Sequence, residues 1–266
     1  MIVFRNKLKH GLYLIWIALF SFSCISSEKT IKWDRMSPHF HVQKFQTKQL
    51  GKRWIVILPG YSGLKVFKDT GHYFRAAEEL NALGFDVMIV EYKKAIRKSG
   101  QHIKGGFGER IKWTTVKAIE WAKEHHYFEA DQSGHLLSWS AGGEGAILLM
   151  NDSLTLVDLG IKSVAMYYPS NRDSVVFRSY IPVLIQSGGD DNVTPAQQIR
   201  STYSNHPNAE LLIYPQAHHG FDVSSVLKEK HLQIPPLLGK KFTFKYDEKS
   251  AIKSSEELFI FLNKYN

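Results

Sequence analysis

Short, nearly continuous apolar runs alternate along the chain with longer segments in which apolar residues recur every three or four positions. The runs are typical of buried strands, and the longer segments of helices that turn one face toward a core. Strands are predicted at residues 54–58, 85–90, 135–137, 161–168, 182–186 and 210–214. Helices are predicted at residues 73–83, 113–122 and 254–262, with another directly after Ser140. Strands that are apolar on both faces need helices on both faces, so the pattern predicts an α/β fold with a mostly parallel central sheet.

Three polar or alternating segments complete this pattern. Residues 41–45 alternate between polar and apolar positions, which predicts a strand at the edge of the sheet. Residues 93–108 and 222–249 are predicted as loops, and each is long enough to form a lid or a wall of a binding pocket.

The first residues carry the pattern of an export signal. Arg5, Lys7 and Lys9 form a positive segment, residues 12–22 are apolar, and small residues follow. The apolar run is shorter than a membrane-spanning helix requires. Cys24 is the only cysteine and lies where cleavage is expected. The segment resembles a bacterial lipoprotein signal, in which that cysteine becomes the lipidated first residue.

Phe22 departs from the small residue that is usual before such a cysteine, so an ordinary secretory signal and an uncleaved anchor stay open. We expect a signal peptide at residues 1–24, a polar tether at 25–40 and one α/β domain at 41–266. The protein is then exported, and is either anchored to the cell envelope through a lipid on Cys24 or secreted or periplasmic. A domain that follows this cysteine has no disulfide and no thiol nucleophile.

Charge and histidine spacing narrow the classes of function. The formal net charge is +9, but the basic residues are spread along the chain and form no stripe, so no nucleic-acid partner is expected. His125 and His126 are adjacent, and His72 and His102 are isolated, so the histidines show no metal-ligand spacing. No metal and no organic cofactor is expected.

Ser140 is the first residue whose position predicts chemistry. It lies between an apolar run and a helix, with Ser138 and Gly142 two residues to either side. Small residues at these positions allow a tight turn that exposes the hydroxyl at the N-terminus of the helix. Ser140 is therefore the candidate nucleophile, although a serine that merely caps a helix has the same local sequence.

An acid and a base follow Ser140 in the order that a serine nucleophile needs. Asp190 and Asp191 come after the strand at 182–186, and His218 and His219 come after the strand at 210–214. Active sites of parallel sheets lie beyond the carboxyl ends of the strands, where these residues are expected. A carboxylate there can orient a histidine, and the histidine can accept the serine proton. The residues alone leave both pairs of neighbours open.

Two backbone N–H groups are expected to hold the oxyanion. Ala141 follows the nucleophile, and Tyr61 lies in the loop after the strand at 54–58. Ser62 in the same loop is a rival nucleophile, but no helical pattern begins directly after it, which favours a turn serine. The aromatic residues Tyr61, Trp139 and Phe221 flank these positions and are candidates for lining an acyl pocket or for packing in the core.

With these positions assigned, the chain resembles the dienelactone hydrolase family of the α/β-hydrolase superfamily over residues 50–264. Residues 182–195 are similar to the acid segment of that family, and their spacing to Pro195 selects Asp191. Residues 214–222 are similar to its histidine segment and select His219. The namesake enzymes use a cysteine nucleophile and carry a glutamate near the oxyanion loop. Here Ser140 and the sequence from Pro59 to Ser62 replace them, so dienelactone is not the expected substrate.

The resemblance implies a serine hydrolase with the catalytic residues Ser140, Asp191 and His219, the oxyanion-hole residues Tyr61 and Ala141, and a small ester or related acyl compound as substrate. A peptidase or amidase on the same fold is the alternative, although the chain shows no added domain that would gate peptide access. A non-catalytic binding protein on this fold would require a broken triad, whereas all three residues are present.

Overall fold

A computed structural model describes residues 40–43, 53–99, 105–129, 131–171, 175–228, 230–232 and 241–265. The predicted signal peptide, Cys24 and the tether up to residue 39 lie outside the described residues, so these assignments stay predictions.

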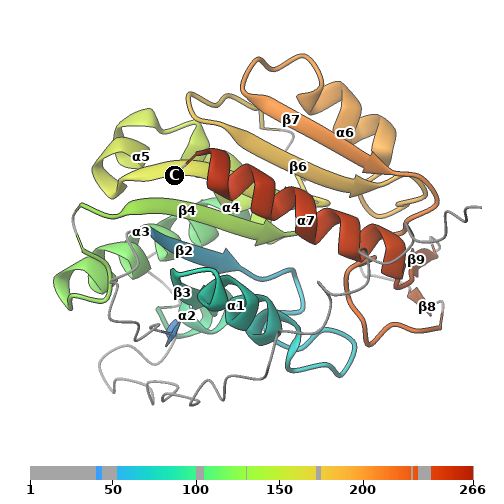
Figure 1. Ribbon diagram of the computed structural model, residues 1–266, viewed down its shortest axis with the longest axis horizontal. Coiled ribbons are helices and arrows are strands. Elements are labelled where there is room, and N and C mark those ends of the chain that lie inside the picture. The colour runs from blue at the N-terminus through green and yellow to red at the C-terminus, as the bar shows by residue number, and fades with distance from the viewer. Residues whose placement is uncertain are drawn as a thin grey trace, which may run out of the picture.

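One seven-stranded sheet forms the centre of the molecule, with the strand order β1-β3-β2-β4-β5-β6-β7 (Figure 1). Six strands run parallel, and they are β2 (Arg53–Leu58), β3 (Phe85–Val90), β4 (Ser133–Trp139), β5 (Ile161–Tyr167), β6 (Val183–Gly188) and β7 (Ala209–Tyr214). At the edge, β1 (Phe40–Gln43) pairs antiparallel with β3. The predicted mostly parallel sheet is confirmed, and β1 confirms the edge strand as far as Gln43.

Helices cover both faces of the sheet. One face packs against α1 (His72–Ala82) and α7 (Glu248–Lys264), which lie in front of the sheet in Figure 1. The other face packs against α2 (Tyr92–Ser99), α3 (Phe107–Glu124), α4 (Gly142–Met150), α5 (Ser153–Leu159) and α6 (Ala196–Tyr203). A hydrophobic core lies on each face of the sheet, and alternate strand residues pack into opposite cores. Val56 and Leu58 pack into one core, and Ile55 and Ile57 pack into the other. This explains why the strands read as continuous apolar runs.

The two predicted loops contain regular structure, which corrects the sequence-based assignment. Residues 93–108 include most of α2 and the start of α3. Helix α2 buries Tyr92 and Ala95, and its other positions are mostly Lys and Arg, which gives too few apolar positions for a helical period. Residues 222–249 include a hairpin of β8 (Lys230–Leu232) and β9 (Phe242–Phe244) and the start of α7.

The short helix α5 also has no clear apolar period, but it has recognisable ends. The side chain of Asp152 accepts a hydrogen bond from the Thr155 N–H at 3.2 Å, which caps the first turn. Gly160 ends the helix in the left-handed conformation at φ 69°. Asp and Gly are also common in turns, so Asp152 and Gly160 can be recognised as caps only when the helix between them is known.

The strand order places a reversal between β2 and β4. From β2 the chain passes to β3 on one side, then crosses back to β4 on the other. The loops that leave the carboxyl ends of β2 and β4 therefore diverge, and sites in open α/β sheets form at such a point. Ser140 follows β4 and Tyr61 follows β2, so both candidates lie at this reversal.

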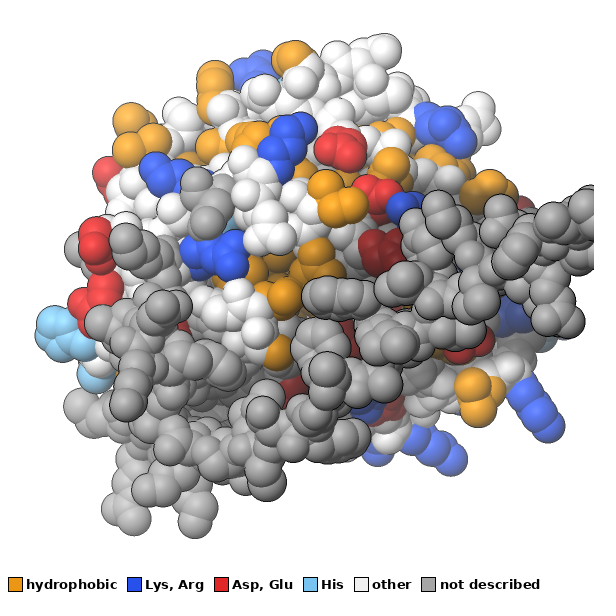
Figure 2. Space-filling view, in the orientation of Figure 1, with side chains coloured by type: hydrophobic (Ala, Val, Ile, Leu, Met, Phe, Trp, Pro, Cys, Tyr) orange, Lys and Arg blue, Asp and Glu red, His pale blue; other side chains and the backbone are white. Residues whose placement is uncertain are grey.

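The surface charge and the helices bear on nucleic-acid binding and on membrane crossing. On the face shown in Figure 2, the described Lys and Arg side chains lie apart, with acidic side chains among them. Among the described residues, no helix combines the length and the apolar character that a bilayer crossing requires.

Candidate active site

Ser140 lies on a strained turn at the end of β4. Its φ of 47° falls in the left-handed region, which costs a side-chain-bearing residue roughly 1–3 kcal/mol. The turn is tight because a Cβ on Gly142 would lie 2.5 Å from the carbonyl oxygen of Leu58, so β2 and the start of α4 are in close contact. Strain held by close packing at a nucleophile position is the geometry predicted for a nucleophile elbow.

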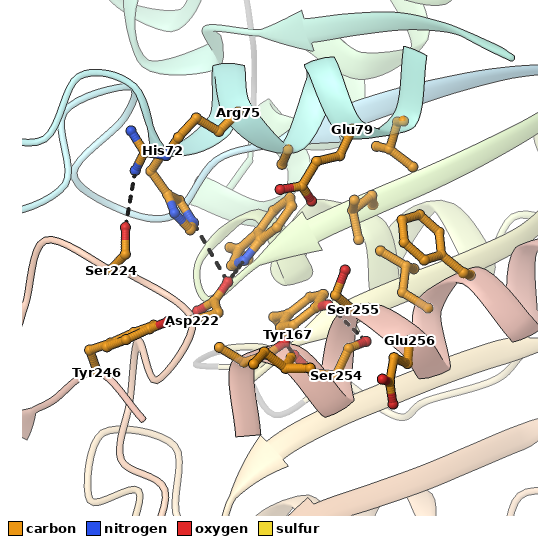
Figure 3. A pocket seen from close by; sticks show the side chains of 18 residues that line it. His72, Arg75, Glu79, Tyr167, Asp222, Ser224, Tyr246, Ser254, Ser255 and Glu256 are labelled. Carbon is orange, nitrogen blue, oxygen red and sulfur yellow. Dashed lines mark hydrogen bonds and ion pairs between the residues drawn. The ribbon is translucent and has the colours of Figure 1, made fainter. Parts of the chain in front are cut away.

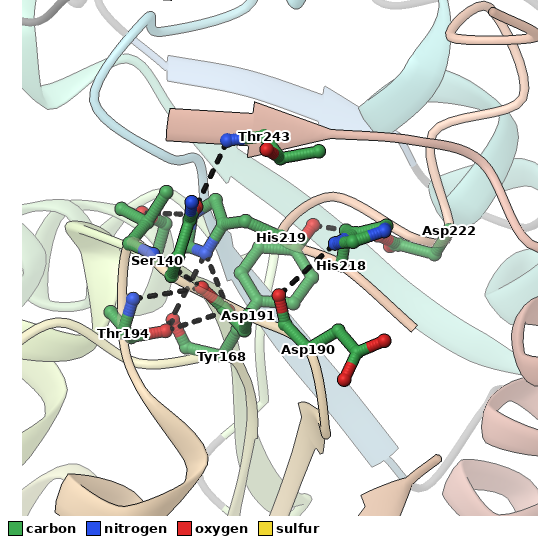
Figure 4. Close-up of polar contacts among 11 residues, drawn as sticks. Ser140, Tyr168, Asp190, Asp191, Thr194, His218, His219, Asp222 and Thr243 are labelled. Carbon is green, nitrogen blue, oxygen red and sulfur yellow. Dashed lines mark hydrogen bonds and ion pairs between the residues drawn. The ribbon is translucent and has the colours of Figure 1, made fainter. Parts of the chain in front are cut away.

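The structure brings Ser140, His219 and Asp191 together in one hydrogen-bonded chain (Figure 4). His219 Nε2 lies 3.0 Å from Ser140 Oγ, and its Nδ1 lies 2.8 Å from Asp191 Oδ2. The side chains of His219 and Asp191 are 6% and 0% exposed, whereas Ser140 is half-buried. With Nδ1 protonated toward Asp191, Nε2 is free to accept the hydroxyl proton, which is the tautomer that a general base needs.

Thr194 holds Asp191 in place and was not identified from the sequence. The N–H groups of Val193 and Thr194 both donate to Asp191 Oδ1 at 2.8 Å. The Thr194 hydroxyl donates to Oδ2 at 2.9 Å and lies 3.5 Å from His219 Nδ1. A threonine three residues after an aspartate at a turn is the sequence signal for such a cluster.

Asp190 and His218, the neighbouring alternatives, point away from Ser140 (Figure 4). His218 Nδ1 lies 3.0 Å from the backbone carbonyl of Asp190, and both side chains are more exposed than their neighbours Asp191 and His219. Asp191 and His219, and not these two neighbours, therefore form the hydrogen-bonded chain with Ser140.

Two buried tyrosines fix the loop that carries Tyr61. The N–H of Gly60 donates to the hydroxyl of Tyr73 at 2.8 Å, and the hydroxyl of Tyr92 donates to the carbonyl of Pro59 at 2.8 Å. A Cβ on Gly60 would lie 3.5 Å from Ser140 Cβ, so this loop passes directly beside the elbow. The N–H of Gly60 is therefore already used within the fold.

Of the two predicted oxyanion donors, Ala141 directly follows Ser140, and Tyr61 directly follows Gly60 in the loop that passes beside the elbow. The carbonyl of Tyr61 accepts from Lys93 Nζ at 2.7 Å, which fixes the orientation of that part of the loop. Ala141 directly precedes α4, where the helix dipole is positive. Ser62 lies exposed in the turn, and α1 begins only at His72, so it lacks the strand–turn–helix setting of Ser140.

The aromatic residues near the site fall into two groups. Trp139 and Phe221 are 3% and 0% exposed and pack in the core between the sheet, α1 and α7. Burial of these large rings stabilises the fold, and Trp139 also lines a cavity between α1 and α7. Tyr61 is 54% exposed, and its ring lies beside Phe107 and Lys93 Nζ. Within the described part of the chain, no three His, Cys, Asp or Glu side chains converge as a metal site.

Comparison with known proteins gives both a family and a fold. A model of the dienelactone hydrolase family matches residues 54–266. The apo form of Thermogutta terrifontis esterase 2 is 17% identical with a TM-score of 0.56, covering 85% of this chain and 88% of that one. The same esterase phosphoramylated by tabun is 16% identical with a TM-score of 0.56, covering 84% and 87%.

An alpha-beta serine hydrolase homologue from Coxiella burnetii is 17% identical with a TM-score of 0.49, covering 68% of this chain and 83% of that one. No curated protein matches the chain by sequence. The esterase structures show that the chain has the α/β-hydrolase fold, which confirms the predicted fold class.

Proposed function

Because the chain belongs to the dienelactone hydrolase family, we propose that it is a serine hydrolase that cleaves a carboxylic ester, or a related acyl compound, through an acyl-enzyme on Ser140. The observation that carries this proposal is the hydrogen-bonded chain from Asp191 through His219 to Ser140. No thiol is present among residues 25–266 to replace the serine, since Cys24 is the only cysteine.

In the first step, Ser140 Oγ attacks the carbonyl carbon while His219 Nε2 takes its proton. Asp191, held by Thr194, keeps His219 oriented and stabilises the imidazolium. The N–H groups of Tyr61 and Ala141 hold the developing oxyanion. His219 then protonates the leaving alcohol, and a water molecule activated by the same histidine releases the acid and restores Ser140.

A fluorophosphonate probe tests the serine chemistry directly. We expect covalent labelling of the folded protein at Ser140, located by peptide mass spectrometry, and no labelling of the Ser140→Ala variant. A solved esterase of the same fold is described as phosphoramylated by tabun, an organophosphorus adduct of the kind that the probe forms. If the folded wild-type protein carries no adduct at Ser140, the proposal fails and a non-catalytic binding protein takes its place.

Paired substrates then separate an esterase from a peptidase or amidase. We expect turnover of p-nitrophenyl acetate, with little turnover of a peptidyl p-nitroanilide that carries the same chromophore. Preferential turnover of the anilide would assign the protein to the alternative class.

We further propose that the protein is exported and anchored through a lipid on Cys24, on the sequence pattern of residues 1–24. Metabolic labelling of the full chain with a fatty-acid probe should mark the wild-type protein and leave the Cys24→Ala variant unlabelled. Export of an unlabelled wild-type protein would favour an ordinary secretory signal.

A further inference from the structure

Asp222 is a second carboxylate close to the candidate triad, three residues after His219. Its Oδ1 accepts a hydrogen bond from the Tyr168 hydroxyl at 2.6 Å, and its Oδ2 accepts one from Trp139 Nε1 at 2.6 Å. Trp139 directly precedes Ser140 in the chain. One carboxylate therefore ties the elbow after β4 to the loop that carries the histidine. Neither the sequence patterns nor the proposed mechanism gives Asp222 a role.

The charge of Asp222 has no cationic partner among the described residues. Its nearest basic group is His72 Nε2, at 3.6 Å from Oδ2, and the two side chains are 8% and 11% exposed (Figure 3). Burial lowers the pKa of His72, so this imidazole is neutral near pH 7. Asp222 is mostly removed from water, and a carboxylate in this setting that only neutral groups hold costs more than an uncharged side chain of the same shape. The negative charge is therefore hard to explain as a packing device alone.

Tyr168 connects this charge to the catalytic histidine. The centroids of the Tyr168 and His219 rings lie 4.3 Å apart. Tyr168 has a φ of 38°, in the left-handed region, so the fold holds it in a strained conformation beside His219. Burial, followed by the charge of Asp222, raises the pKa of the Tyr168 phenol well above its usual value. The phenol thus stays protonated and donates to Asp222 throughout the working pH range.

A phenol that donates to a carboxylate carries more electron density on its ring, and ring faces attract cations. The imidazolium of His219 forms only while Ser140 transfers its proton, so an electron-rich ring beside it stabilises the charge at that moment. We propose that Asp222 is a positioning residue for His219, acting through Tyr168, which it orients and polarises to stabilise the imidazolium. This inference rests on the proposed serine-hydrolase mechanism.

The proposal predicts a change in the pH profile. Other titratable or charged groups near His219 and Asp222 could also affect that profile. His219 also faces Asp191, Thr194 and Ser140, and the ring of Phe244 lies 5.5 Å from its own. Asp222 lines a cavity of about 450 Å³ between α1 and α7, together with the charged or titratable residues His72, Arg75, Glu79, Tyr167, Tyr246 and Glu256 (Figure 3). Arg75 is paired with Asp69, so it does not neutralise Asp222.

The test compares Asp222→Asn, Tyr168→Phe and the double variant with the wild-type protein, using p-nitrophenyl acetate across a pH series. Asp222→Asn keeps the shape and removes the charge, and Tyr168→Phe keeps the ring and removes the donated hydrogen bond. We expect each to lower kcat by about two- to thirtyfold with KM little changed. We also expect the acidic limb of the pH profile to move to lower pH by up to about one unit, since the imidazolium loses support.

The double variant tests whether Asp222 acts through Tyr168. Its loss in kcat should be close to that of the larger single variant, because both changes break the same path. Losses that multiply, with an acidic limb that does not move, would assign Asp222 a structural role only. A kcat for Asp222→Asn equal to that of the wild type would overturn the proposal.

Asp152→Asn is the matched control, because Asp152 is also a carboxylate that holds hydrogen bonds, from Thr155 and Lys112. It lies beyond the far end of α4, about 13 Å along the helix from the elbow. This variant should lose stability while its pH profile stays in place. A shift of the acidic limb in the control would show that the profile reports stability.

An NMR titration of the His219 ring separates failure of this proposal from failure of the proposed function. The midpoint should fall in Asp222→Asn and in Tyr168→Phe, and this measurement needs no turnover. If the midpoint falls but the wild type neither labels at Ser140 nor hydrolyses esters, the proposed function fails and the coupling stands. If the wild type is active and the midpoint is unchanged in both variants, the coupling fails and the proposed function stands.

Discussion

The three candidate catalytic side chains differ in how the fold holds them. Asp191 is fully buried and accepts three hydrogen bonds from Val193 and Thr194, so its position is fixed by the local turn. His219 depends on long-range contacts with Asp191 and with the ring of Tyr168. Ser140 is held by its own strained backbone. Changes at the residue scale should therefore affect activity through distinct physical causes.

Replacement of Ser140 by alanine removes the attacking oxygen and leaves the turn. We expect kcat/KM for a p-nitrophenyl ester to fall by about 10⁴-fold or more, because the base and the oxyanion donors have no nucleophile to assist. Alanine retains the same left-handed strain, so the melting temperature should stay close to that of the wild type. Substantial remaining activity would point to another nucleophile, with Ser62 the first to examine.

Replacement of Thr194 by valine tests the support of Asp191. The variant loses the hydroxyl donor to Oδ2 and keeps the backbone N–H that donates to Oδ1. A hydrogen bond to a charged group contributes about 1.5–3 kcal/mol, so kcat should fall by about ten- to a hundredfold. Thr194→Ser restores the hydroxyl and should recover most of the activity. If the serine variant is as slow as the valine variant, the hydroxyl alone does not support Asp191 and the prediction is wrong.

At the scale of elements, the site depends on contacts between segments that are distant in sequence. Helix α4 begins against the end of β2, because Gly142 lies close to the carbonyls of Leu58 and Pro59. The end of β6 lies similarly against the histidine loop, since a Cβ on Gly188 would be 2.2 Å from the carbonyl oxygen of Ala217. The first contact holds the elbow against the end of β2, and the second holds the acid loop against the histidine loop.

Replacement of Gly142 by alanine should separate α4 from β2. The added Cβ would lie 2.5 Å from a backbone oxygen that has no flexible alternative, and overpacking of this kind costs about 1–3 kcal/mol. Urea denaturation should show this loss, together with lower activity. Gly60→Ala is the control for stability, since its Cβ would meet no atom closer than 3.4 Å. Equal stability of the two variants would contradict the close contact.

The whole molecule carries buried histidines whose protonation couples stability to pH. His135 is 0% exposed between β4 and β5, with Nδ1 at 2.9 Å from Ser163 Oγ. Burial, and then the charge of Arg53, lowers the pKa of His135 to about 4. Between the ordinary pKa of histidine, about 6.5, and this value, the unfolded chain binds a proton that the folded chain does not. Folding stability should therefore fall as the pH falls through that window.

We expect His135 to account for roughly 3 kcal/mol of this loss by pH 4, at about 1.4 kcal/mol for each unit of pKa difference. Urea denaturation at pH 7.5, 5.5 and 4.5 measures it. In His135→Asn, where an amide replaces the titrating ring, stability should depend less on pH. His126→Asn, at a side chain that is 81% exposed, should behave like the wild type. An unchanged pH dependence in His135→Asn would contradict the prediction.

The sequence by itself determined the apolar runs, most of the helices between them and the order of a serine, two adjacent aspartates and two adjacent histidines, because these depend on local periodicity and on residues that follow strand ends. The resemblance of residues 182–195 and 214–222 to family segments favoured Asp191 and His219, the same two residues whose side chains meet Ser140 in the structure. The sequence missed α2 and α5, where charged positions or short length hide the helical period. It also gave no signal for the pairing of β8 with β9, because register between distant short strands is not a local property.

Only the tertiary structure decided which side chains meet. The crossing from β3 back to β4 brings the Tyr61 loop beside Ser140, and no local pattern contains that crossing. Hydrogen bonds across the fold separate Asp191 from Asp190 and His219 from His218. The contacts of Asp222 with Trp139 and Tyr168 span 83 and 54 residues. Such contacts arise from packing of the whole sheet, which is why residues distant in sequence form one site.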